Sequence, residues 1–254
     1  MQPVIVFPLH DPEGVTFSHL EVNTPGLKEV FSGACVGITP VTYERRQEGI
    51  SHLEKDDFFT LFHLPPGGLV GDQFLYLYRQ AANVYQPEQV LHLCFIDRLA
   101  FILQSSYQRQ FIEDVRAIQS GDTPFIFSRS EKAWATHPRN YYEIERMVTT
   151  ASQLLFKKEL DFAWCHLVVQ AGQLQRVLPS VRNHDLSMVA ELVLGLKDEV
   201  KTKEVDWLAW EDPFIYSRDL QELKEEREHS QEEIRKRLSY VIPMLQLLYA
   251  AANI

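Results

Sequence analysis

Five short apolar runs occur along the first half of the chain, and several are apolar at consecutive positions. They span residues 4–9, 35–41, 58–64, 90–95 and 124–127. Continuous apolar runs are typical of strands that are covered on both faces of a parallel sheet, whereas half-exposed strands alternate apolar and polar residues. The pattern therefore predicts strands of a mostly parallel sheet.

Stretches with helical periodicity separate these runs. Apolar residues recur every three or four positions over residues 99–118, which predicts one long amphipathic helix, and again over 144–155. Residues 72–85 follow the loop Pro65-Pro66-Gly67-Gly68, which delivers the chain to a helix start. This alternation predicts an α/β fold with a single doubly wound, mostly parallel sheet flanked by helices.

The second half of the chain is more helical. Residues 162–177 are apolar enough for a buried helix or for a helix–strand pair, and residues 203–210 have the pattern of a strand. Residues 219–237 are dense in charge and lack a sustained apolar heptad, which favours a solvated surface helix over a coiled coil. We expect one α/β domain over residues 1–218 and a helical C-terminal extension over 219–254 packed on the same domain.

The composition, the net charge and the motifs that are missing argue against several classes of function and binding partner. A chain of 254 residues with 45% hydrophobic residues can bury a substantial core within one domain. The formal net charge of −10 argues against a nucleic-acid partner, because phosphate contacts need clustered Lys and Arg. No G-x-S-x-G, P-loop, H-E-x-x-H or G-x-G-x-x-G motif occurs, which disfavours hydrolase, kinase, zincin and dinucleotide-binding functions.

The cysteines and the apolar segments indicate the cellular compartment in which we expect the protein. Cys35, Cys94 and Cys165 lie far apart, so we expect reduced core thiols rather than a disulfide framework or a zinc site. Residues 4–9 are too few for a secretory signal, and no segment is suited to span a bilayer. We therefore expect a cytoplasmic protein with no transmembrane segment, and the sequence leaves a homodimer open.

Polar clusters follow four of the predicted strands, where ligands bind to an open parallel sheet. They lie at residues 8–13, 39–44, 95–98 and 128–130. One such cluster is common in any α/β protein. Together, the four clusters predict a ligand site at the carboxyl edge of the sheet.

The succession of these segments resembles the GT-A glycosyltransferases, the nucleotide-diphospho-sugar transferase superfamily. Residues 4–13 are similar to the opening strand of that family, and Gly67-Gly68 to its Gly-containing loop. Residues 91–97 are similar to the strand that ends in an Asp-x-Asp metal motif, and residues 125–130 to a later strand that ends in Gly-Ser-Arg or Gly-Arg-Thr. The resemblance extends over residues 3–212.

Three departures from the family pattern affect the chemistry that the resemblance implies. Phe95 occupies the first position of the Asp-x-Asp motif, so only Asp97 remains to hold Mg²⁺ or Mn²⁺ against a diphosphate. After the second strand, where the family usually offers an Asp to the nucleoside, the chain has Thr39, Thr42 and Glu44. Ser128 replaces a Gly in the later motif. We therefore expect only weak binding of Mg²⁺ or Mn²⁺, and we expect Arg98 and Arg129 to offset part of the diphosphate charge.

The resemblance implies a glycosyltransferase-like protein that binds a nucleoside-diphosphate sugar and transfers the sugar to an unidentified acceptor. The donor-binding residues that it implies are Pro8, Asp11, Gly68, Arg98 and Arg129. The candidate catalytic residues are Asp97, which is also the candidate metal ligand, and, as alternatives for the general base, Glu44 and His137.

Several of these residues also have a purely structural interpretation. Asp97 could cap the helix that begins at Arg98, and Arg129 could form an ordinary ion pair with Glu143 or Glu145. His137 could be a surface loop histidine. The alternative function is a catalytically degenerate GT-A-fold binding or scaffold protein. The missing first Asp favours it, and the polar residues kept at the other strand ends favour the enzyme.

Overall fold

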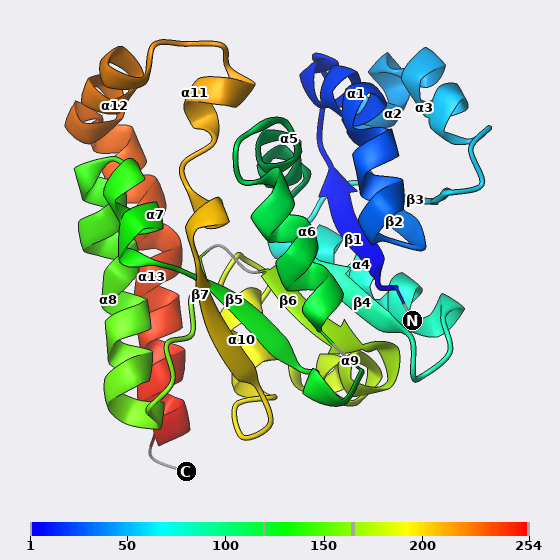
Figure 1. Ribbon diagram of the computed structural model, residues 1–254. Helices are drawn as coiled ribbons and strands as arrows, with labels where there is room; N and C mark the ends of the chain where they lie inside the picture. The colour runs from blue at the N-terminus through cyan, green and yellow to red at the C-terminus, as the bar shows by residue number, and fades with distance from the viewer. Residues whose placement is uncertain (1, 119, 164–165, 253–254) are drawn as a thin grey trace.

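The computed structural model describes residues 2–118, 120–163 and 166–252, and a sheet of seven strands lies at its centre (Figure 1). The strands are β1 (Val4–Leu9), β2 (Gly33–Ile38), β3 (Phe59–His63), β4 (Val90–Leu93), β5 (Phe125–Arg129), β6 (His166–Gln170) and β7 (Lys201–Val205). All five runs that predict strands in the first half of the chain are strands, with ends that differ by up to three residues.

The strand order along the sheet is β3-β2-β1-β4-β6-β5-β7. Parallel pairs join β1 to β2 and β4, β2 to β3, and β5 to β7. Strand β6 runs antiparallel to both of its neighbours, β4 and β5. The expected mostly parallel sheet is therefore confirmed, with the difference that β6 separates β4 from β5.

Helices cover both faces of this sheet. One face carries α1 (Val15–Val30), α3 (Gln47–Leu53), α5 (Ile96–Gln104) and α6 (Gln108–Ala117). The other carries α4 (Val70–Val84), α8 (Arg139–Phe156), α9 (Ala171–Val177), α10 (Met188–Leu194) and α13 (Gln231–Ala252). The remaining helices are α2 (Pro40–Arg45), α7 (Glu131–Thr136), α11 (Asp212–Ile215), α12 (Leu220–His229) and the 3₁₀ turns η1 (Ser120–Asp122), η2 (Leu178–Ser180) and η3 (Asp206–Leu208).

Strand β1 explains why the apolar runs are continuous. Successive side chains of a strand point to opposite faces of the sheet. Val4 and Val6 pack into the core beneath α4 and α10. Ile5, Phe7 and Leu9 pack into the core beneath α1 and α5. Both faces are covered, so every position of the strand is selected for an apolar residue.

Two expected helices are each divided, and a serine lies at each division. The expected helix over residues 99–118 is α5 followed by α6. Between them the hydroxyl of Ser105 donates to the Ile102 carbonyl at 3.0 Å and accepts from the amide of Tyr107 at 3.2 Å. The expected helix over 219–237 breaks at Ser230, whose hydroxyl accepts from the amide of Glu233 at 3.2 Å. Such local side-chain bonds offer the backbone an alternative to the helix.

Two ambiguous segments of the second half take definite forms. In the described part of residues 162–177, strand β6 is followed directly by α9, so the strand and helix pair replaces the single buried helix. In residues 203–210 the strand ends early, at Val205, and η3 follows. Trp207 is consequently buried in the core by the 3₁₀ turn and not by a strand.

The C-terminal helices pack against the α/β unit. Helix α13 lies alongside α8 and also touches α10, and α12 contacts the start of the same bundle (Figure 1). The buried side of α13 consists mainly of Tyr240, Val241, Met244 and Leu248. Among the described residues, no helix has the length and apolar character needed to cross a bilayer.

Candidate functional site

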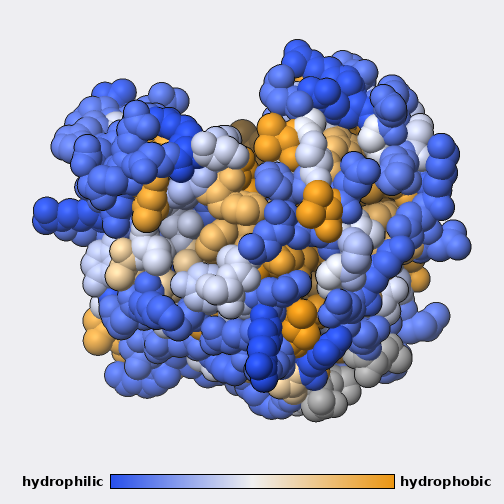
Figure 2. All heavy atoms as spheres, turned by 45° about the horizontal axis from the view of Figure 1, so that its top comes forward, coloured by the Kyte–Doolittle hydropathy of each residue, from blue (hydrophilic) through white to orange (hydrophobic). Residues whose placement is uncertain are grey.

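A cavity of about 260 Å³ lies at the carboxyl edge of the sheet, beside the end of β4. Segments far apart in the sequence line it: Asp97 follows β4, Glu145 lies on α8, Asp212 begins α11 and Lys236 lies on α13. The carboxyl ends of parallel strands share one edge, so the segments after β4, β5 and β7 converge there. Figure 2 shows the molecule with the carboxyl edge of the sheet turned toward the viewer. The surface is hollowed there between two protruding groups of hydrophilic residues.

The cavity has an apolar part and a charged part. The apolar part includes Phe95, Phe162, Leu186, Val189 and Met244, and the hydroxyl-bearing rings of Tyr141, Tyr216 and Tyr240 lie beside it. Ligand sites for small molecules commonly enclose roughly 300–1,000 Å³. A cavity of this size accommodates a sugar ring or a diphosphate, with the rest of a larger ligand outside.

Asp97 is the predicted site residue that lines this cavity. It stands in the first turn of α5, and its Oδ1 accepts the amide of Arg98 at 3.0 Å. The preceding Phe95 packs its ring against Phe74, with the ring centroids 5.5 Å apart. The first position of the family's metal motif is thus filled by an aromatic packing contact.

The residues present do not match the metal site that the resemblance implies. A phenyl ring has no metal ligand, and Asp97 alone supplies one carboxylate. Among the described residues, no group of three or more His, Cys, Asp and Glu side chains is arranged to hold a metal ion. The weak Mg²⁺ or Mn²⁺ binding expected from the sequence stays a prediction.

Arg98 and Glu211 form a buried ion pair behind Asp97. The guanidinium Nη1 lies 2.8 Å from Glu211 Oε2, and the two side chains are 1% and 2% exposed. Arg98 Nη1 also donates to the carbonyl of Ala209 at 3.2 Å. Burial raises the pKa of Glu211 well above its ordinary value, and the charge of Arg98 opposes that rise. Arg98 therefore fastens the segment after β7 to α5 and does not line the cavity.

Asp212 is the neighbouring carboxylate, and it does line the cavity. It is the first residue of α11, next to Pro213. Its Oδ2 is 3.7 Å from Nη2 of Arg227. Burial raises the pKa of Asp212, and Arg227 and Arg98 oppose the rise. A half-buried carboxylate that lies beside a cavity and has a raised pKa accepts a proton more readily than an exposed carboxylate.

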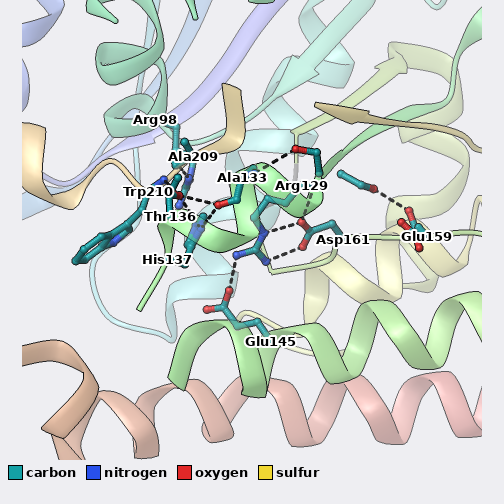
Figure 3. A network of polar contacts seen from close by, with 12 residues as sticks. Arg98, Arg129, Ala133, Thr136, His137, Glu145, Glu159, Asp161, Ala209 and Trp210 are labelled. Carbon is teal, nitrogen blue, oxygen red and sulfur yellow. Dashed lines mark hydrogen bonds and ion pairs between the residues drawn. The ribbon is translucent and has the colours of Figure 1, made fainter. Parts of the chain in front are cut away.

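Arg129 is buried in a network of polar contacts (Figure 3). Its Nε and Nη2 donate to the two oxygens of Asp161 at 2.7 and 2.9 Å, and its Nη1 donates to Glu145 at 2.8 Å. The guanidinium also lies over the ring of Trp134, 3.5 Å from its centroid. Of the structural partners considered from the sequence, Glu145 is therefore the one observed, while Glu143 pairs with Arg139.

Alternating charges continue from this network to the cavity. Glu145 also accepts from the Tyr240 hydroxyl at 2.6 Å and faces Nε of Arg237 at 3.0 Å. Arg237 then reaches Glu233 at 3.2 Å, and Arg227 lies between Glu233 and Asp212. Each deep carboxylate thus faces at least one guanidinium, which buried charges require.

The predicted donor residues on the β1–β3 side have structural roles. Asp11 accepts the amides of Val15 and Phe17 at 2.9 and 2.8 Å and so caps α1. Gly68 has φ +77°, and a Cβ on it would lie 2.7 Å from Oδ2 of Asp72, so the turn before α4 needs glycine here. Pro8 lies within β1, opposite Gly37 of β2. None of the three lines the cavity beside Asp97.

The two alternative bases also lie outside the cavity. Glu44 is exposed on α2. His137 is buried rather than in a surface loop, and its Nδ1 lies 2.9 Å from the Ala133 carbonyl. Burial, with the charges of Arg129 and Arg98, lowers the pKa of His137 well below its ordinary value, so the ring is neutral at pH 7. Of the eight site residues predicted from the sequence, Asp97 alone lines this cavity.

Sequence reasoning missed the residues that share the cavity with Asp97. Glu211 and Asp212 follow Trp210 shortly after β7, so they form a polar cluster behind a strand like the four clusters found. The strand predicted over residues 203–210 ends directly before them, so the rule used for the other four clusters would have found them. The cavity residues Arg227 and Lys236 stand in a stretch where charged residues are dense, and no local signal distinguishes them from solvated neighbours.

Comparisons of the chain with known protein families and with curated proteins found no match.

Proposed function

We propose that the protein is a glycosyltransferase that binds a nucleoside-diphosphate sugar at the cavity beside β4 and transfers the sugar to an acceptor hydroxyl. One observation carries the proposal. Asp97, from the end of β4, and Asp212, from the segment after β7, line the same cavity at the carboxyl edge of one sheet. Ligands of open α/β sheets bind at this edge. The resemblance of residues 3–212 to GT-A enzymes supports a nucleotide-sugar donor there.

Asp212 is the general base in this proposal. The acceptor oxygen forms a bond to the anomeric carbon while its proton passes to the Asp212 carboxylate. The bond between that carbon and the diphosphate oxygen breaks, and the nucleoside diphosphate leaves with the electron pair. Because burial raises the pKa of Asp212, the ionised carboxylate accepts a proton more readily than an exposed one.

Asp97 holds the donor sugar. One of its oxygens accepts the amide of Arg98, which orients the carboxylate at the start of α5. Its other oxygen can then accept a sugar hydroxyl in the cavity that it lines. A carboxylate fixed by one backbone bond is well placed for this, since little rotamer freedom remains to be lost on binding.

The alternative is a protein that keeps this sheet and binds a ligand without catalysis. The observation in its favour is Phe95, which removes a carboxylate from the position where the family holds a metal. The two candidates agree on binding and differ on turnover, so one set of experiments separates them.

The first experiment is a thermal-shift screen against UDP-, GDP- and ADP-sugars, followed by calorimetry with the best ligand. Release of the nucleoside diphosphate, with water as acceptor, then measures turnover. We expect Asp212→Asn to bind the donor normally and to lower turnover by about 100-fold or more. The control is Asp57→Asn, which alters an exposed carboxylate outside the cavity. Binding without turnover favours the alternative, and no binding of any nucleotide sugar rejects the glycosyltransferase and leaves the scaffold protein.

A further inference from the structure

The diphosphate of a sugar donor needs positive charge, and the two arginines expected to supply it cannot reach it. Arg98 is paired with Glu211 and Arg129 with Asp161 and Glu145, and both guanidiniums are 1% exposed or less. A buried pair of this kind is costly to separate, because the partner carboxylate would be left without compensation. Another source of charge is required if a donor binds here.

The cationic side chains that line the cavity come from the C-terminal helices. They are Arg227 on α12 and Lys236 and Arg237 on α13. On α13 the lining residues recur every three or four positions, from Glu233 to Met244, so one face of the helix turns to the cavity. The C-terminal extension thus forms a wall of the site.

These three cations differ in what already binds them. Arg237 is held by Glu145 at 3.0 Å and by Glu233 at 3.2 Å. Arg227 is held by Glu233, but its contact to Asp212 is long at 3.7 Å, and its buried Nε has no hydrogen-bond acceptor among the described residues. Lys236 makes no ion pair or hydrogen bond with the described part of the chain, and its side chain is exposed at the cavity. Lys236 and Arg227 therefore have donors to spare.

We propose that Lys236 and Arg227 bind the diphosphate of the donor and compensate its charge in place of the divalent cation. This inference rests on the proposed function. Lys236 supplies a mobile ammonium with three donors, and Arg227 supplies a planar guanidinium that suits phosphate oxygens. When a phosphate oxygen binds Arg227, the guanidinium moves away from Asp212. The Asp212 carboxylate is then free to take the proton from the hydroxyl of the acceptor. The donor would then bind in the absence of metal and would require the C-terminal helices.

The test is calorimetric titration of the full chain with two probes, inorganic pyrophosphate and the nucleotide sugar selected by the screen, each with Mg²⁺ and with EDTA. Lys236→Ala removes the exposed ammonium, and Lys236→Arg restores a charge. The matched control is Arg235→Ala, which removes a charge from the adjacent residue of α13 that is exposed and lies outside the cavity. Arg227→Gln is titrated in the same way. Its melting temperature is measured as well, because the substitution also removes the ion-pair partner of Glu233.

We expect both probes to bind in EDTA within about two-fold of their affinity in Mg²⁺. We expect Lys236→Ala to weaken both by about ten-fold, as for one charge-assisted hydrogen bond, while Lys236→Arg and Arg235→Ala stay near the wild type. Nucleotide-sugar binding that disappears in EDTA, or that Lys236→Ala and Arg235→Ala lower equally, overturns this inference and leaves the proposed function standing. Pyrophosphate binding that depends on Lys236, with no binding of any sugar nucleotide, supports the cationic wall and rejects the proposed donor. No binding of either probe rejects both.

Discussion

At the carboxyl edge of the sheet, the ends of β1 and β2 differ from the ends of β4 and β7 in what their polar side chains do. After β1, both oxygens of Asp11 accept amides of α1, and the amide of Asp11 donates to Thr42 at 2.7 Å. Thr39, after β2, donates to Thr42 at 2.9 Å. These polar groups bond to backbone amides and to one another across the ends of two neighbouring strands, and they hold α1 and α2 in place.

After β4 and β7 the polar side chains meet partners from distant parts of the chain. Arg98 and Glu211 join the two strand ends, and Asp97 and Asp212 remain at the wall of a cavity with part of their hydrogen-bonding capacity unused. Polar residues follow the strands in both regions, so residue types alone do not distinguish the ends of β1 and β2 from the ends of β4 and β7. A capping role uses up a carboxylate, and a site is found where the carboxylate has capacity left.

The largest effect is expected from Arg129→Ala, which should destabilise the β4–β7 half by about 3–5 kcal/mol. The substitution leaves Asp161 and Glu145 buried with one cation fewer. Urea denaturation of the purified protein measures the loss. The control is Arg139→Ala, which removes an exposed pair with Glu143 and should leave the urea midpoint near that of the wild type. A wild-type midpoint for Arg129→Ala would show that this half does not depend on its buried charges.

Acid should weaken the same half, because three buried histidines lie in it. Burial lowers the pKa of His92 to about 3 and lowers the pKa values of His137 and His166 well below the ordinary value. The unfolded chain binds protons at these residues below about pH 6.5, while the folded chain does not, so stability is full above that pH and falls as the pH decreases. Glu211 and Asp212 act in the opposite direction, because their pKa values are raised in the folded state.

The variant His137→Gln isolates one histidine, since an amide can still donate to the Ala133 carbonyl that Nδ1 contacts. We expect the slope of unfolding free energy against pH between 5 and 6.5 to decrease by about 1 kcal/mol per pH unit relative to the wild type. In the wild type, hydrogen exchange at pH 5.5 should show faster opening of β5 and β6 than of β1 and β2. Equal acceleration of both halves would remove the distinction drawn between them.

The same distinction explains which parts were predictable from the sequence. Strands such as β1 are covered on both faces, so their apolar runs stand out without knowledge of the partners. The break at Ser105 and the orientation of β6 depend on hydrogen bonds and pairings that periodicity does not encode.

For the site, a polar cluster after a strand was enough to select Asp97. Whether such a residue caps a helix, as Asp11 does, or lines a cavity with Asp212 depends on contacts between residues far apart in the chain. Arg227 and Lys236 show the limit most plainly, because the packing of α12 and α13 against α8 brings their helices to the cavity.

The smallest effect is expected at the other end of the sheet, from Asp11→Ala. Loss of the cap should lower the free energy of unfolding by about 1 kcal/mol, because the amides of Val15 and Phe17 lose their acceptor at the start of α1. Asp11→Asn keeps one acceptor oxygen and should recover most of the loss. Binding of the nucleotide sugar selected by the screen should stay within about two-fold of the wild type, since a residue outside the cavity makes no charge-assisted bond to the ligand. Asp97→Asn should behave in the opposite way, with near wild-type stability and weaker binding. If calorimetry instead finds that Asp11→Ala abolishes binding at unchanged stability, the donor site extends to β1 and the two ends of the sheet share one function.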